Sequence, residues 1–106
     1  MGFNQRDMMR QIEQMQRKME KAQAEVAAST VEGSAGGGVV TVSMSGDQEM
    51  RSITIQPEVV DPEDIETLQD LVVAAVSDAL ERSKKLQADR LGEVTGGLGL
   101  PPGLGF

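Results

Sequence analysis

The groups that could do chemistry in this 106-residue chain are carboxylates, amines and guanidinium groups, because the sequence contains no histidine and no cysteine. Zinc sites with nitrogen and sulfur ligands, histidine acid–base catalysis, cysteine nucleophiles and disulfides are thereby excluded. No serine has an evident basic partner to activate it as a nucleophile, apart from lysines whose positions the sequence leaves open. The sequence therefore argues against an enzyme.

Two local patterns resemble ligand sites but have the wrong spacing. The Gly-rich run at 33–38 leads into a strand and lacks the lysine and helix of a phosphate-binding loop, so we interpret it as a flexible connector. An acidic cluster lacks the alternate ligand positions and central glycine of a calcium loop, and is typical of a helix N-terminus. It comprises Glu58, Asp61, Glu63, Asp64 and Glu66. We expect neither a metal nor a cofactor.

Basic residues gather in two segments, although the net charge of the chain is −7. Residues 1–10 and 82–91 together carry six Lys and Arg against Asp7 and Asp89, a net of +4, which leaves −11 for the rest. These six basic residues are the candidate contacts to a polyanion. They are Arg6, Arg10, Arg82, Lys84, Lys85 and Arg90.

The apolar residues of the N-terminal segment recur at alternating intervals of four and three, which predicts one helix over residues 4–28. They are Met8, Ile12, Met15, Met19, Ala22 and Val26. Alternation then predicts a half-buried strand at 40–45 and another through Ile53 and Ile55, stopped by Pro57. With a turn at Gly46, these two strands should form an antiparallel hairpin, and residues 30–32 can add a third strand.

A second long helix is predicted from Asp61, its N-cap, with Pro62 at the first helical position, to Leu91, where Gly92 stops it. The Gly-rich and Pro-rich remainder is interpreted as a flexible tail. We therefore predict a single α-β-β-β-α domain over residues 1–91 and a tail over residues 92–106. The fold class is α+β, with a three-stranded antiparallel sheet between two long helices.

The two helices are longer than so small a sheet can cover, so part of each apolar seam is left exposed. The edges of the sheet are exposed as well, and we therefore expect a two-fold homodimer. The far ends of the helices should meet away from the sheet and unite the basic segments in one tip on an acidic body. An alternative interpretation is that these Lys and Arg side chains only complement a helix dipole. No signal peptide or membrane span is evident, so we expect a cytoplasmic protein without membrane contact.

Nearly all of the chain resembles the YbaB/EbfC family of bacterial nucleoid-associated DNA-binding proteins. The matching segments, in order, are MMRQIEQMQRKMEKAQAEV, GGVVTVSMSG, RSITIQPEVV, DPEDIETLQDLVVAAVSDAL and LGLPPGLGF. The resemblance implies a tweezers-like homodimer that binds double-stranded DNA and associates with the nucleoid. It supplies no compact binding motif, so the six candidate DNA contacts rest on the charge pattern alone.

The negative net charge and the absence of Trp and Tyr predict modest affinity for duplex phosphates with little sequence preference. Such a protein could organise the nucleoid or modulate gene expression. Double-stranded DNA and a second copy of the chain are the expected partners, and no small-molecule substrate is expected. The alternative function is a protein-interaction module, an adaptor or chaperone, that uses the Met-rich surface of the first helix.

Overall fold

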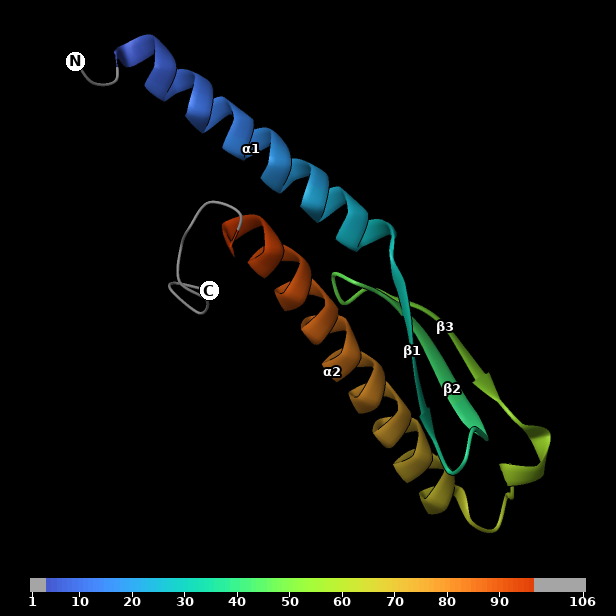
Figure 1. Cartoon of the computed structure of the whole chain (residues 1–106). Coiled ribbons are helices and arrows are strands. Elements are labelled where there is room, and N and C mark those ends of the chain that lie inside the picture. Colours follow the sequence, from blue (N-terminus) through green and yellow to red (C-terminus); the bar gives the residue numbers. More distant parts are fainter. Residues whose placement is uncertain (1–3, 97–106) are drawn as a thin grey trace.

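A long helix, a three-stranded antiparallel sheet and a second long helix follow one another in the computed structural model, which describes residues 4–96 (Figure 1). The sheet has the strand order β1-β2-β3, and α2 lies along one of its faces. This order confirms the predicted α+β fold. The elements are α1 (Gln5–Ala28), β1 (Thr30–Ala35), β2 (Val40–Ser45), β3 (Met50–Ile55), the short 3-10 turn η1 (Pro57–Val59) and α2 (Ile65–Gly96).

The first helix has the predicted extent. The side chain of Asn4 caps it by accepting a hydrogen bond from the Asp7 amide at 2.8 Å. At the other end, Ser29 is extended, and its hydroxyl donates to the Glu25 carbonyl at 2.7 Å. The chain therefore passes directly from α1 into β1, which fixes the direction in which α1 leaves the sheet.

The predicted flexible connector at 33–38 is wrong for its first half, because β1 continues to Ala35. Gly33 is buried in that strand against α2, and a Cβ atom built there would lie 2.6 Å from the Ala75 carbonyl oxygen. Of these six residues, only 36–38 lie in the turn, with φ angles of 62°, 74° and 98° that glycine adopts without strain. Gly33 thus serves close packing rather than flexibility.

The second helix begins later and ends later than predicted. Asp61 and Pro62 form a turn instead, in which the Asp61 carbonyl accepts from the Asp64 amide at 2.9 Å. Asp64 then caps the helix by accepting from the Thr67 amide at 3.3 Å. The helix also continues through Gly92 to Gly96, so the predicted end at Leu91 is wrong. The rest of the predicted tail, residues 97–106, lies outside the described residues.

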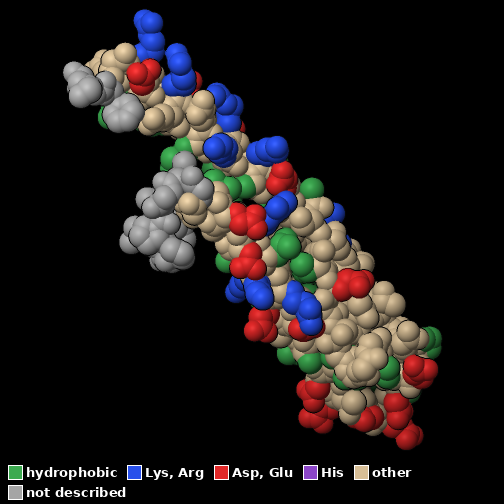
Figure 2. Space-filling model, in the orientation of Figure 1, with side chains coloured by type: hydrophobic (Ala, Val, Ile, Leu, Met, Phe, Trp, Pro, Cys, Tyr) green, Lys and Arg blue, Asp and Glu red, His purple; other side chains and the backbone are tan. Residues whose placement is uncertain are grey.

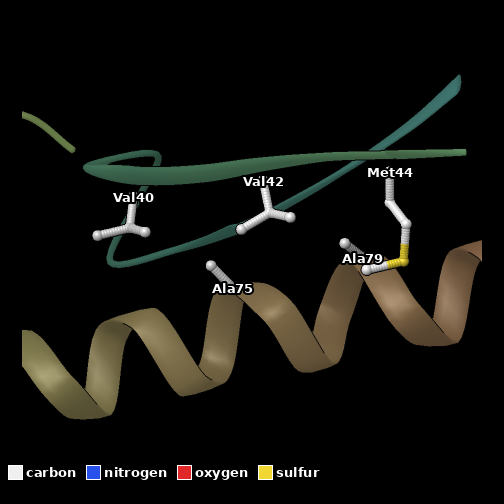
Figure 3. Close-up of a cluster of buried hydrophobic side chains, with 5 residues drawn as sticks. All are labelled: Val40, Val42, Met44, Ala75 and Ala79. Atoms are coloured by element: carbon white, nitrogen blue, oxygen red, sulfur yellow. The ribbon is translucent and has the colours of Figure 1, made fainter. Parts of the chain in front are cut away.

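The core lies between β2 and α2, where Val40, Val42 and Met44 face Ala75 and Ala79 (Figure 3). The two alanines let the helix backbone approach the sheet closely. The register places two isoleucines of β3 on the same side of the sheet, next to Val40 and Val42. One of them, Ile53, is exposed, so α2 leaves the apolar side of β3 partly bare.

A buried hydroxyl fastens the turn after β2 to α2. Ser83 is fully buried, and its hydroxyl donates to the Ser45 carbonyl at 2.6 Å. The Ser83 hydroxyl oxygen also accepts hydrogen bonds from the backbone amide of Gln48 at 3.1 Å and from its side-chain amide at 3.0 Å. Gln48 has a φ of 67°, which is uncommon for a residue other than glycine. These bonds hold the strained turn in place.

Replacing Ser83 by alanine is expected to lower the free energy of unfolding by about 1–2 kcal/mol, because the hydrogen bonds that join the Ser45 carbonyl and Gln48 to α2 are lost, while the Gln48 amide still donates to the Ser45 carbonyl at 3.2 Å. Urea denaturation measures the change. Ser77→Ala is the matched control, since Ser77 lies on the exposed surface of the same helix. Equal stability of the Ser83 variant and the parent would contradict a structural role for these hydrogen bonds.

Candidate nucleic-acid interface

The molecule is elongated because α1 extends past the end of α2. Its extents are 76 × 22 × 16 Å and its radius of gyration is 20.0 Å, whereas a compact chain of this length has about 13 Å. The last turns of α2 lie beside the second half of α1, and Arg90 Nη2 is 3.0 Å from Glu25 Oε2 in the last turn of α1. Residues 5–17, which we call the α1 arm, are all exposed and project beyond α2 (Figure 1).

Basic side chains share one face of α1. Arg6, Arg10, Arg17 and Lys21 are separated by four, seven and four residues, close to whole turns of a helix, and all are exposed. We call these four residues the basic face. Arg17 and Lys21 are not among the contacts predicted from the sequence, because that prediction rests on the charge near the helix ends alone. Their spacing from Arg10 was the signal that could have identified them.

The predicted residues on α2 lie away from the arm. Arg82 Nε is 3.2 Å from Asp78 Oδ1, and Asp78 accepts from the Ser34 amide of β1, so Arg82 lies beside the sheet. Arg90 pairs with Glu25 and lies 3.7 Å from Glu93. Lys84 and Lys85 are exposed on α2 between these two arginines.

The expected meeting of the two helix ends is therefore wrong. Fifteen residues of α1, or about 22 Å of helix, separate Arg10 from Glu25, the residue that α2 reaches through Arg90. The structure brings Arg6 and Arg10 together on the arm and leaves the four α2 residues along the body. The two helix ends do not meet because of how the helices are aligned with each other. Ser29, where α1 ends and the chain enters β1, fixes the position of α1 relative to the sheet.

Charge is polarised along the molecule (Figure 2). Residues 5–21 hold five Lys and Arg against three Asp and Glu. Residues 52–81, which include the part of β3 after Arg51 and the first half of α2, hold eight Asp and Glu and no Lys or Arg. A polyanion would thus be attracted to the α1 end and repelled by the opposite end, whatever the net charge.

Asp78 links α2 to the edge of the sheet. Its carboxylate accepts from the Ser34 amide at 3.0 Å and pairs with Arg82 at 3.2 Å. The hydrogen bond from the Ser34 amide is the largest effect, and it lowers the pKa of Asp78 below its ordinary value. Desolvation opposes this shift, and the Arg82 guanidinium lowers the pKa further. The ionised carboxylate is the form that holds β1 to α2.

Asp78 should make stability depend on pH in the acidic range. Because its folded-state pKa is lowered, its stabilisation is fully present above the ordinary carboxyl pKa and is lost as the pH falls through the lowered value. Asp78→Asn should therefore be less stable than the parent at neutral pH, and the two should converge at an acidic pH below the lowered pKa of Asp78. Urea midpoints at both pH values measure this, with Asp70→Asn as the control on exposed helix surface. A constant difference would contradict the assignment.

Other kinds of site find no support between residues 4 and 96. No group of three or more acidic side chains in that range could hold a metal ion. None of the helices described has a stretch long and apolar enough to cross a membrane. The basic face of α1 is the strongest candidate for a functional surface.

The chain is an α+β protein with a projecting, basic helical arm and an acidic opposite end. This arrangement is typical of a protein that binds a polyanion at its basic end. The model of the YbaB/EbfC DNA-binding family matches residues 1–98. The chain therefore belongs to the YbaB/EbfC DNA-binding family, and its functional class is a DNA-binding protein rather than an enzyme.

Similar proteins support this assignment. A nucleoid-associated protein of Chloroflexus aurantiacus is 54% identical over 96 residues, which cover 91% of this chain and 96% of that protein. A nucleoid-associated protein of Acetivibrio thermocellus is 48% identical over 103 residues, 97% of this chain and 91% of that one. The crystal structure of an uncharacterized protein from Helicobacter pylori has the same fold, with a TM-score of 0.72, 18% identity, and coverage of 92% of this chain and 99% of that one.

Proposed function

We propose that the chain binds double-stranded DNA through its phosphates, with little sequence preference, as a nucleoid-associated protein of the cytoplasm. The observation that carries this proposal is the basic face, four cations on one exposed side of a projecting helix. Its curated relatives are named nucleoid-associated proteins, which supports the same role. In that role it would organise the nucleoid or modulate gene expression.

The geometry of the basic face suits a duplex backbone. From Arg6 to Lys21 it extends over about 22 Å, which corresponds to about six base pairs at 3.4 Å each. Guanidinium groups bind phosphate oxygens in a bidentate way, and such contacts carry no sequence information. The two phenylalanines of the sequence, Phe3 and Phe106, are its only aromatic residues, so residues 4–96 offer no platform for base stacking.

The candidate residues on α2 have a secondary part in this proposal. Lys84 and Lys85 are exposed, and they can approach a duplex that extends from the arm toward the body. Arg82 and Arg90 already hold carboxylates, so contact with phosphate would require them to exchange one anion for another. We therefore assign the main phosphate contacts to Arg6 and Arg10, extended by Arg17 and Lys21.

We infer that the binding species is a homodimer. An open groove between β3 and α2 is lined by Ile55, Leu68, Val72 and Val73, next to the exposed Ile53. A two-fold partner would cover this apolar surface and give the molecule two arms. Light scattering should then give twice the chain mass of 11.3 kDa. A folded monomer at micromolar concentration would contradict the dimer but not DNA binding by one arm.

A gel shift with the purified full-length chain tests the function. Unrelated duplexes of equal length should be retarded at similar protein concentrations, and the retardation should disappear as salt rises. Absence of a shift at low salt would overturn the proposal. If, in addition, protein partners remained bound at high salt, the chain would be an adaptor or chaperone instead.

A further inference from the structure

The side of the arm opposite its arginines is apolar and bare. Met8, Ile12 and Met15 are 54%, 52% and 40% exposed, although they continue the spacing of residues that are buried lower on the same helix. Those lower residues, Ala22 and Val26, are 7% and 1% exposed and pack in the body of the protein. The same apolar series thus changes from core to surface where α1 passes the end of α2. We call Met8, Ile12, Met15 and the half-buried Met19 the Met stripe.

The Met stripe has the sequence properties of a helix–helix seam. Its intervals of four, three and four residues place every member at the two apolar positions of a heptad. The positions that flank such a seam are uncharged over the arm itself, where they are Met9, Gln11 and Gln16. Two identical arms could therefore pack stripe to stripe without repulsion between like charges at their flanks.

The arginines of the arm are all placed away from this seam. Arg10 and Arg17 occupy the heptad position farthest from it, and Arg6 occupies an outer position as well. An arm whose arginines contact a duplex would consequently present its Met stripe on the side away from that duplex. The stripe would be accessible to another arm on a second duplex segment.

The length of the stripe decides when such pairing would occur. Met8 to Met19 is less than two heptads, whereas a stable coiled coil requires about three to four. Free arms should therefore associate too weakly to be populated at low concentration. Arms held on neighbouring duplex segments have a much higher effective concentration, at which a short seam suffices.

We propose that the Met stripe pairs with the Met stripe of a second copy of the chain when both copies are bound to DNA, so that the protein holds two duplex segments together. This inference rests on the proposed DNA binding. The occupant of the stripe is another arm, because the stripe matches itself in spacing and its flanking positions are uncharged except for Lys18, which lies next to Met19 at the inner end.

A bridging assay tests the proposal. Beads that carry one duplex are mixed with a second, fluorescent duplex and the full-length protein, and the captured fluorescence is measured. The variant Ile12→Gln with Met15→Gln should reduce capture by about tenfold or more, since the multivalent link is lost. Ile12→Leu with Met15→Leu keeps the apolar contact and should retain capture. Both variants should bind a single duplex like the parent, because neither touches the basic face.

The outcomes separate the two proposals. Failure of the parent to bind even a single duplex would overturn the proposed function, and the bridge with it. Normal binding of single duplexes without capture of a second one would overturn only the bridge. Equal capture by the Gln and Leu variants would also overturn it, because the contact would then not depend on the apolar stripe.

Cross-linking identifies what covers the stripe, since the chain has no cysteine of its own. Ile12→Cys should be joined to a second chain by a short bis-maleimide when duplex DNA is added, whereas Gln14→Cys, on the opposite side of the same helix, should not. Equal cross-linking of Ile12→Cys without DNA would overturn the dependence on DNA. Cross-linking that appears only after the chain is shortened behind Gly96 would show that its own C-terminal segment covers the stripe, and would also overturn the proposal.

Discussion

Replacing Arg10 and Arg17 together by glutamate is expected to weaken binding to duplex DNA by roughly a hundredfold at about 0.1 M salt. Each lost phosphate contact removes about 0.9 from the slope of log K against log salt, so the slope should fall by about 2 for each arm in contact. The loss should be equal for unrelated duplexes, because phosphate contacts carry no sequence information. Fluorescence anisotropy of labelled duplexes across a salt series measures both quantities.

The fold should survive these two substitutions, since both arginines are exposed and neither contributes to the core. The matched comparison is between two single variants, Arg10→Glu and Arg51→Glu. Each reverses one charge, but Arg51 lies on β3, in the sheet. Arg51 Nη2 also donates to the Ala27 carbonyl at 2.8 Å, so circular dichroism should accompany that variant. Loss of binding in Arg51→Glu, with normal binding in the arm variants, would make the sheet the contact surface.

The largest effect on stability is expected for Gly33→Val. The Cβ atom would overlap the backbone of Ala79 and lie 2.6 Å from the Ala75 carbonyl oxygen, and backbone atoms cannot turn aside as a flexible side chain can. Relief requires α2 to move off β1 and opens the core. We expect the free energy of unfolding to fall by about 3 kcal/mol or more, at or above the upper end of typical overpacking effects.

Urea denaturation of Gly33→Val measures this loss, and Ser34→Val is the matched control. Ser34 is the next residue of β1, so its side chain points to the opposite side of the strand, where it is exposed. A valine there should be tolerated because β-branched residues suit a strand. If both variants were equally stable, the close approach of β1 to α2 would be wrong.

Local pattern was sufficient to predict much of this fold. The alternating four-three spacing predicted α1 to within one residue, and the period-two alternation at 40–45 predicted β2. The ends of α2 were predicted wrongly for a different reason. Gly92 is a strong local stop signal, but Arg90 and Val94 lie against α1 and favour continuation of the helix past it. Contacts between segments distant in sequence leave no local signal.

The candidate site was predictable in part for the same reason. Clustering of charge at the chain ends identified Arg6 and Arg10, and helical spacing could have added Arg17 and Lys21. The position of Arg90 beside Glu25 depends on the register between two helices that are separated by the whole sheet. That register follows from tertiary packing, such as the contact of Gly33 with α2, and no spacing within one segment reveals it.

Cleavage of DNA from a defined position on the protein shows whether the arm carries the DNA contact. Glu13 lies between Arg10 and Arg17 in the sequence and close to them on the helix surface, and Glu63 lies in the turn before α2, at the acidic end. Glu13→Cys and Glu63→Cys change the charge equally, and each gives the chain a single cysteine to which an iron chelate can be attached. Hydroxyl radicals generated at position 13 should cut a bound duplex, whereas those from position 63 should leave it intact. If cleavage from position 63 equalled or exceeded cleavage from position 13, the DNA contact would not lie on the arm.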